Sequence, residues 1–128
     1  MIRVLLVDDD AVYRRIFILL LETQPDIRVV GEAGSLAEAR PMLRDVDVAI
    51  LDRRLPDGDG LELIGELREA SPGAKVLVIS AYEELVNQRE ALEAGADRVL
   101  GKVGLHDEVF VTIRQLGGKQ SPAIYPSA

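Results

Sequence analysis

Short apolar runs that are rich in branched side chains recur along this chain, and they constrain its fold more than any other feature. The five runs are residues 3–7, 27–30, 46–51, 75–79 and 99–100. Short runs this continuously apolar are typical of parallel strands that are covered on both faces of a sheet. Between them lie segments in which apolar residues recur every three or four positions, which predicts amphipathic helices. The sequence therefore alternates strand and helix.

Apolar stripes place the predicted helices. The stripes are Val12, Ile16, Leu19 and Leu20; Leu61, Ile64 and Leu67; Leu85, Val86 and Leu92; and Val109, Ile113 and Leu116. A capping box at Ser35-Leu36-Ala37-Glu38 predicts the start of a further helix. Because proline interrupts helical hydrogen bonding, Pro41 should kink or shorten that helix.

Five strands alternating with five helices in 128 residues predict a three-layer α/β sandwich with right-handed crossovers. We expect a flavodoxin-like doubly wound sheet, with five parallel strands in the order 2-1-3-4-5. The length suits one domain, which we place at residues 1–117. Residues 118–128 lack the helical pattern and are expected to be a flexible tail or the start of a linker.

Composition excludes several kinds of site and partner. The chain has no cysteine, so disulfides and thiolate metal ligands are excluded, and its single histidine makes a histidine metal site implausible. A formal net charge of -7 disfavours direct binding to nucleic acid, whose phosphates would repel the surface. The longest wholly apolar run, residues 16–21, is far shorter than the about 20 residues that span a bilayer. With no signal peptide recognised, we expect a cytoplasmic protein that does not enter the membrane.

Polar residues follow four of the apolar runs. Asp8 and Asp9 follow the first run and Asp52 follows the third. Ser80 follows the fourth run and Lys102 the fifth. Ligands of doubly wound sheets bind beyond the carboxyl ends of the strands, at the point where the strand order reverses. We therefore expect these five side chains to form one site.

Carboxylates gathered at one edge indicate a cation. Two of them 4 Å apart repel by about 4 kcal/mol at an effective dielectric constant near 20. Mg2+ suits a small oxygen cluster that leaves positions for water and phosphate. Beside such an ion Asp52 could attack phosphorus and become an aspartyl phosphate. The Ser80 hydroxyl and the Lys102 ammonium could then contact the phosphoryl oxygens.

The ordered set of motifs resembles the receiver domain of two-component response regulators. The motifs are Asp8-Asp9 after the first strand, Asp52 followed by Leu55-Pro56 and Asp59-Gly60, Ser80-Ala81, and Lys102. The resemblance covers roughly residues 2–117. It implies a phosphorelay signalling switch, and not an enzyme beyond its own phosphorylation. The phosphoryl donor would be a sensor histidine kinase or a phosphotransfer protein.

The resemblance also implies a role for each acidic residue. Asp52 would accept the phosphoryl group, and Asp9 and Asp52 would ligate Mg2+ directly. Asp8 would act through a water molecule, and the backbone carbonyl of Arg54 would complete the protein ligands.

The same resemblance describes how the signal would leave the site. Ser80 and Lys102 would contact the phosphoryl group, and Ser80 would move toward it. Residues 83–116 would form the output or dimer surface, with a homodimer formed on phosphorylation. Two positions depart from the family pattern: Val99 stands where an aromatic residue commonly swings inward, and Val103 stands where a cis proline commonly follows the lysine.

Two alternatives stay open. Residues 5–12 also fit the pattern of haloacid-dehalogenase phosphatases, in which Asp8 would be the nucleophile and Asp10 the acid/base. The chain is short for that family, lacks an evident cap domain, and would leave the Asp52 turn unexplained. The other alternative is a receiver-like interaction module that no longer uses phosphate, motivated by Val99 and Val103.

The chain is also loosely similar to receivers that precede helix-turn-helix output domains, which suggests a transcriptional regulator. Any contact with DNA would then belong to a domain outside these residues.

Overall fold

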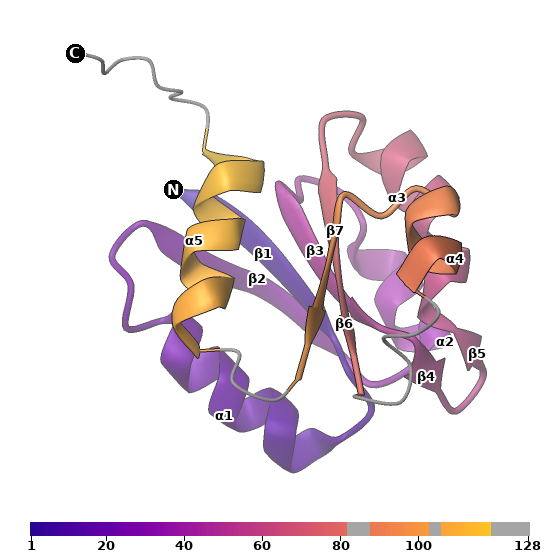
Figure 1. Cartoon of the computed structure of the whole chain (residues 1–128), viewed down its shortest axis with the longest axis horizontal. Helices are drawn as coiled ribbons and strands as arrows, with labels where there is room; N and C mark the ends of the chain where they lie inside the picture. The colour runs from indigo at the N-terminus through magenta and orange to yellow at the C-terminus, as the bar shows by residue number, and fades with distance from the viewer. Residues whose placement is uncertain (82–87, 103–105, 119–128) are drawn as a thin grey trace.

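A parallel sheet forms the centre of the computed structural model, which describes residues 1–81, 88–102 and 106–118. Within these residues the sheet has five strands: β1 (Ile2–Val7), β2 (Ile27–Ala33), β3 (Val48–Asp52), β6 (Lys75–Ser80) and β7 (Arg98–Gly101). All neighbours pair in parallel, in the order β2-β1-β3-β6-β7. Counted along the chain, this is the predicted order 2-1-3-4-5, so the predicted flavodoxin-like fold is confirmed (Figure 1).

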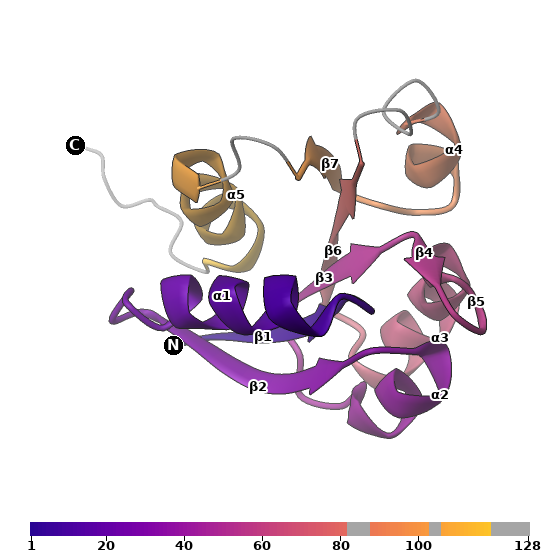
Figure 2. The ribbon, with the colours of Figure 1, turned by 90° about the horizontal axis from the view of Figure 1, so that it is seen from below.

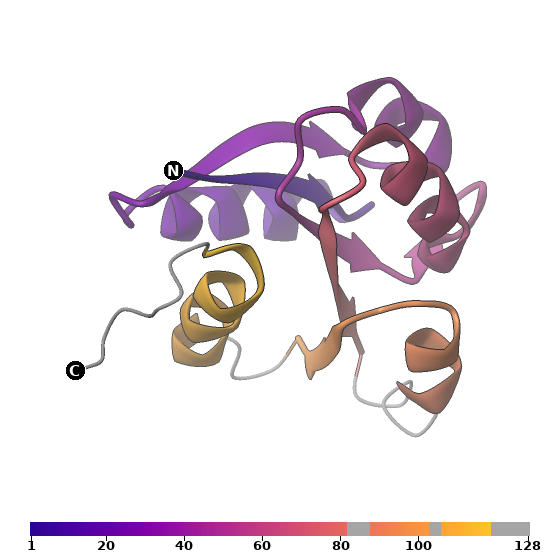
Figure 3. The ribbon, with the colours of Figure 1, turned by 90° about the horizontal axis from the view of Figure 1, so that it is seen from above.

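Helices cover both faces of the sheet, as Figures 2 and 3 show from opposite sides. One face carries α1 (Ala11–Leu21) and α5 (His106–Gly117). The other carries α2 (Leu36–Ala39), α3 (Leu63–Ala70) and α4 (Gln88–Glu93), with the short 3-10 helices η1 (Arg40–Met42) and η2 (Gly60–Glu62). Among the described residues, no helix combines the length and the apolar character needed to cross a membrane.

Each central strand divides its side chains between two cores. In β1, Leu5 and Val7 pack on the side of α2 and α3, whereas Val4 and Leu6 pack on the side of α1 and α5. Successive side chains of a strand point to opposite faces, and both faces are covered here. This is why the strands appear in the sequence as continuous apolar runs instead of alternating ones.

The predicted buried face of α1 is wrong. Val12, Ile16 and Leu19 are 70%, 53% and 62% exposed, and Leu20 is only partly buried. The core instead receives Phe17, Ile18 and Leu21. Residues 16–21 are all apolar, so either side of the helix could have been buried. Packing against β1 and α5, which the local pattern does not encode, selects the face.

The start of α2 agrees in part with the predicted capping box. The Ser35 hydroxyl accepts a hydrogen bond from the Glu38 N–H at 3.1 Å, as expected of an N-cap. The Glu38 carboxylate, however, accepts from the Gly34 N–H at 2.7 Å. The α-helix ends at Ala39, and Pro41 lies in η1, so the predicted shortening is confirmed.

A small hairpin between β3 and α3 was not predicted as strands. It consists of β4 (Arg54–Leu55) and β5 (Gly58–Asp59). Both oxygens of Asp57, between these strands, accept hydrogen bonds from the start of α2, at 2.8 and 3.0 Å. Asp59 caps η2 in a reciprocal capping box with Glu62. The hairpin therefore links the segment after Asp52 to two helices.

Some sequence predictions concern residues outside those that the structure describes. These are Leu85 and Val86 of the fourth stripe, Val103, and residues 119–128 of the expected tail. The domain boundary at residue 117 also stays a prediction.

Candidate functional site

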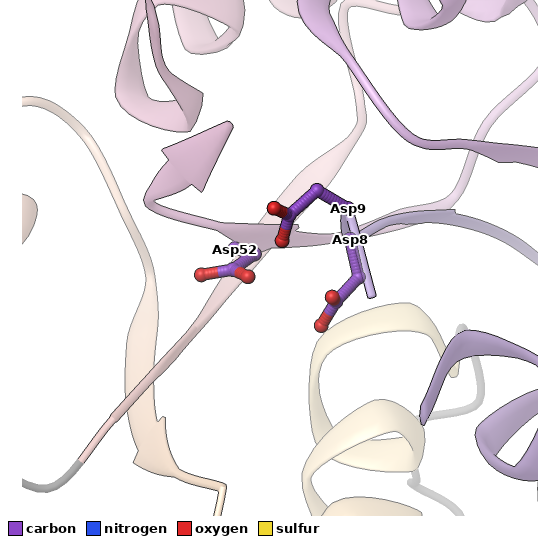
Figure 4. Close-up of side chains that lie close together, drawn as sticks. All are labelled: Asp8, Asp9 and Asp52. Carbon is purple, nitrogen blue, oxygen red and sulfur yellow. The ribbon is translucent and has the colours of Figure 1, made fainter. Parts of the chain in front are cut away.

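Three carboxylates meet at the carboxyl ends of β1 and β3, which are neighbours in the sheet (Figure 4). One oxygen from each of Asp8, Asp9 and Asp52 lies within 4.8 Å of the others. Asp8 is wholly buried and Asp52 almost so, whereas Asp9 is exposed. Parallel pairing aligns the two strand ends, and this brings residues distant in the sequence together at the expected edge.

Lys102 follows β7 and neutralises part of this cluster. Its Nζ lies 2.9 Å from Asp8 Oδ2 and donates a hydrogen bond to Asp52 Oδ2 at 3.1 Å. Burial and then the charge of Asp8 raise the pKa of Asp52, although Lys102 acts in the opposite direction. Burial alone would lower the pKa of Lys102, but its interactions with Asp8 and Asp52 raise it above its ordinary value. The ammonium therefore stays charged, with two carboxylates beside it.

One buried oxygen in the cluster is incompletely satisfied. Asp8 Oδ2 makes no hydrogen bond within the part of the chain that the structure describes, despite its ion pair with Lys102. The other Asp8 oxygen accepts from the Asp10 N–H at 2.9 Å. A buried carboxylate oxygen that lacks a donor is a natural neighbour for a cation. Together with the short separations among the three carboxylates, it makes the site fit a divalent cation with oxygen ligands.

The turn after β3 holds Asp52 closely. The Arg54 N–H donates to Asp52 Oδ1 at 3.2 Å. At Gly60, a Cβ atom would lie 2.1 Å from the Asp52 backbone oxygen, so no larger residue fits without a shift of the backbone. The Gly60 N–H donates to the Arg53 backbone oxygen at 3.0 Å. The glycine thus lets the hairpin fold back onto the end of β3.

Ser80 lies at the same edge of the sheet. It ends β6, one position beyond the residue that pairs with Asp52, and it is 1% exposed. Its backbone oxygen accepts a hydrogen bond from the Lys102 N–H at 3.0 Å, which ties the ends of β6 and β7 together. The structure thus places Ser80 beside the strand that carries Asp52. The roles expected for Ser80 and for the Arg54 carbonyl stay predictions.

Val99, one of the two departures from the family pattern, lies within β7. It pairs with Val78 and packs, partly buried, against the core on the side of α2 and α3. The position is thus filled by a small aliphatic side chain that belongs to the core.

The sequence did not single out two α1 residues that contact the site. The Arg14 guanidinium donates to the Asp8 backbone oxygen and pairs with Glu32 at 3.0 Å. The Tyr13 ring lies 4.7 Å from Lys102 Nζ, measured to the ring centroid. Their position in the helix that follows the acidic pair is a signal that could have marked both residues.

The sequence did not predict the contacts of Arg53. The Arg53 side chain is 13% exposed and donates to Asp59 and to Glu90 of α4, both at 2.8 Å. It therefore connects the residue after Asp52 to α4.

Known proteins are similar to this chain in sequence and in fold. The family model of the response regulator receiver domain matches residues 4–114. The chain is 40% identical over 124 residues to the DNA-binding transcriptional activator DevR/DosR of Mycobacterium tuberculosis and 38% identical over 115 residues to the transcriptional regulatory protein UhpA of Salmonella typhimurium. These alignments cover 94% and 88% of this chain but only 57% of each relative.

A solved structure of a receiver domain is also similar to this chain. The signal receiver domain of the putative response regulator NarL from Mycobacterium tuberculosis matches with a TM-score of 0.80 and 30% identity, over 93% of this chain and 98% of that one. The chain thus spans little more than half of the curated relatives, but nearly all of this isolated receiver domain. It belongs to the family of response regulator receiver domains.

Proposed function

We propose that Asp52 accepts a phosphoryl group in a Mg2+-dependent reaction. The observation that carries this proposal is the cluster of Asp8, Asp9 and Asp52, with oxygens within 4.8 Å of one another and with Lys102 beside two of them. Receiver domains use a divalent metal, and an acidic cluster at the switch point of the sheet suits one.

Each residue of the cluster has a part in holding the ion. Asp9 and Asp52 would ligate it directly, Asp8 would act through water, and the backbone carbonyl of Arg54 would complete the protein ligands. When bound, Mg2+ screens the negative charge that otherwise keeps an anionic carboxylate away from a phosphoryl group. The exposed position of Asp9 leaves one side of the site open to a phosphoryl donor.

The transfer itself uses Asp52 as nucleophile. A carboxylate oxygen of Asp52 forms a bond to phosphorus while the bond from phosphorus to the donor breaks, and the donor leaves with the bonding electrons. Lys102 needs to move only a short distance to neutralise a phosphoryl oxygen, because its ammonium is already 3.1 Å from Asp52 Oδ2. Ser80 would donate its hydroxyl to another oxygen.

Receiver domains of two-component systems pair with histidine kinases, so the donor is a sensor histidine kinase or a phosphotransfer protein. Phosphorylation adds about -1.5 to -2 charges at neutral pH, which would change the surface toward α4, β7 and α5 and could drive homodimerisation. DevR/DosR and UhpA are transcriptional regulators, and we propose the same role for the whole protein, with DNA bound outside this domain. The cytoplasmic location stays a prediction.

Intact-mass spectrometry after incubation with acetyl phosphate and Mg2+ tests the proposal. Wild type should gain the mass of one phosphoryl group, and Asp52→Asn should gain none. Asp45→Asn is the matched control, because Asp45 is an exposed aspartate at the opposite end of the sheet, at a positive φ that asparagine tolerates. An adduct on Asp52→Asn equal to that on wild type would overturn the assignment.

The phosphatase alternative gains no support from the site. Asp10 is the N-cap of α1, where its side chain accepts from the Val12 and Tyr13 N–H groups, so it is held away from an acid/base role. Turnover of p-nitrophenyl phosphate that is lost in Asp8→Asn and kept in Asp52→Asn would restore that alternative. The phosphate-independent module would be favoured if Mg2+ and a phosphoryl mimic left the oligomeric state and partner binding unchanged.

A further inference from the structure

The Tyr13 ring contacts both Lys102 of the site and Phe17 of the core. It lies in the first turn of α1, where its N–H donates to the Asp10 carboxylate at 3.0 Å. Its ring packs edge-on against Phe17, with 5.7 Å between ring centroids and 82° between the ring planes. Phe17 is 4% exposed and belongs to the core beneath α1 and α5. Core packing therefore fixes the ring at the rim of the acidic cluster.

The Lys102 ammonium lies between this ring and the carboxylates. Its Nζ is 4.7 Å from the Tyr13 ring centroid, 2.9 Å from Asp8 Oδ2 and 3.1 Å from Asp52 Oδ2. The lysine also lines a small apolar cavity with Tyr13, Phe17 and Phe110. An ammonium is attracted to the face of an aromatic ring within about 6 Å, and more strongly where water is partly excluded. Tyr13 thus supplies a third attractive surface for the charge.

The contact of Lys102 with the ring matters because its two other partners, the carboxylates of Asp8 and Asp52, would bind the cation and the phosphoryl group during the reaction. A divalent cation held by the carboxylates would compete with Lys102 for Asp8 and Asp52, and phosphorylation would use one Asp52 oxygen. A lysine side chain has four rotatable carbon–carbon bonds and is readily released into water when it loses its partners. The ring face of Tyr13 is not changed by either event.

We propose that Tyr13 is a positioning residue that keeps the Lys102 ammonium over the acceptor pocket when the carboxylates are taken by the cation and the phosphoryl group. This inference rests on the proposed phosphoryl transfer to Asp52. It assigns the effect to the ring face and not to the hydroxyl. Burial raises the pKa of Tyr13 to about 12, so the phenol carries no charge at neutral pH.

Two substitutions separate the ring from the hydroxyl. Tyr13→Phe keeps the ring face, whereas Tyr13→Leu keeps an apolar side chain without the ring. With acetyl phosphate and Mg2+, the rate of phosphorylation should be unchanged in Tyr13→Phe and about fivefold lower in Tyr13→Leu, which corresponds to about 1 kcal/mol. A rate in Tyr13→Leu equal to that of wild type, or an equal loss in Tyr13→Phe, would overturn the proposal.

A double-mutant cycle shows whether the effect passes through Lys102. In a Lys102→Met background, Tyr13→Leu should have no further effect on the rate, because no ammonium remains to be positioned. The same fivefold loss in both backgrounds would show that the ring acts through packing and would contradict the proposal. A wild-type protein that forms no adduct at all would instead sink the proposed function, so the two failures are distinguishable.

A spectroscopic measurement on the unmutated protein does not depend on the folding of any variant. The Lys102 side-chain protons near Nζ should show an upfield ring-current shift in nuclear magnetic resonance spectra, and Tyr13→Phe should preserve it. The shift should persist after Mg2+ and beryllofluoride, a phosphoryl mimic, are added. Loss of the shift on addition of the mimic would show that the ring releases the ammonium, against the proposal.

Discussion

Removing the charge of Asp52 should stabilise the metal-free protein. In Asp52→Asn the side chain keeps nearly the same shape, and its amide oxygen can still accept from the Arg54 N–H that contacts Oδ1 at 3.2 Å. The substitution removes the repulsion of Asp52 by Asp8 and by Asp9, but also its attraction to Lys102. The sign of the result depends on which contribution is larger.

The distances decide this balance. One oxygen each of Asp8 and Asp9 lies within 4.8 Å of an Asp52 oxygen, so each of the two repulsions costs at least about 3.5 kcal/mol at an effective dielectric constant of 20. The attraction of Asp52 to Lys102 at 3.1 Å contributes about 5 kcal/mol on the same scale. The two repulsions together exceed the attraction by about 2 kcal/mol, and screening of the exposed Asp9 reduces the net gain for Asp52→Asn to about 1 kcal/mol. For a chain of this size, that gain corresponds to a rise in melting temperature of about 5 °C.

Urea denaturation followed by circular dichroism in EDTA measures the gain, with Asp45→Asn as the matched control that should leave the midpoint unchanged. Adding Mg2+ should stabilise wild type more than Asp52→Asn, because the substitution removes a carboxylate through which the folded protein would bind the ion. If Asp52→Asn unfolded at lower urea than wild type in EDTA, the carboxylate cluster would not be a net source of repulsion, and the reasoning would fail.

The pH dependence has a definite sign. Folding raises the pKa of Asp52, first through burial and then through Asp8, so the folded state holds its proton more tightly than the unfolded chain does. The stabilising effect of that proton is complete below the unfolded pKa, near 3.8, and is lost as the pH rises through the folded pKa. The advantage of Asp52→Asn over wild type should therefore be small at acidic pH and grow toward neutrality. An advantage that stayed constant from acidic to neutral pH would contradict the account.

Two further predictions concern the segment after β3. Gly60→Ala should destabilise the fold by about 2 kcal/mol or more, because its Cβ would meet the Asp52 backbone oxygen at 2.1 Å. Gly65→Ala, whose Cβ would have nothing within 4 Å, is the control and should stabilise α3 by up to about 1 kcal/mol. Chemical denaturation measures both variants, and equal effects would contradict the role of the close approach at Gly60. Arg53→Met should cost about 1 kcal/mol, and Glu90→Gln less, because Glu90 is 65% exposed. Equal losses in these two variants would show that the outer ion pair dominates.

The fold and most of the site could be predicted because buried parallel strands can be recognised from the local sequence. Each buried strand is a short apolar run, and the residue that follows it lies at the edge where ligands bind. Asp52 and Lys102 were found by this rule although 50 positions separate them in the chain. The acidic cluster follows from the topology alone.

What could not be predicted depends on contacts between distant segments. The buried face of α1 was missed because residues 16–21 offer apolar side chains on every side. The contacts of Tyr13 and Arg53 were missed because their partners, Lys102 and Glu90, lie far along the chain. No local sequence pattern shows which distant segments come together. The hairpin of β4 and β5 was missed because its second strand, β5, consists of a Gly and an Asp, which are typical of turns.

The central claim is that Asp52 is the phosphoacceptor, and chemical mapping of the phosphoryl group tests it most directly. Borohydride reduces an aspartyl phosphate to homoserine, so protein treated with acetyl phosphate and Mg2+ and then with borohydride should carry homoserine at position 52 in peptide mass spectra. Omitting Mg2+ should remove this product. Homoserine at position 8 or 9, with Asp52 unmodified, would contradict the account.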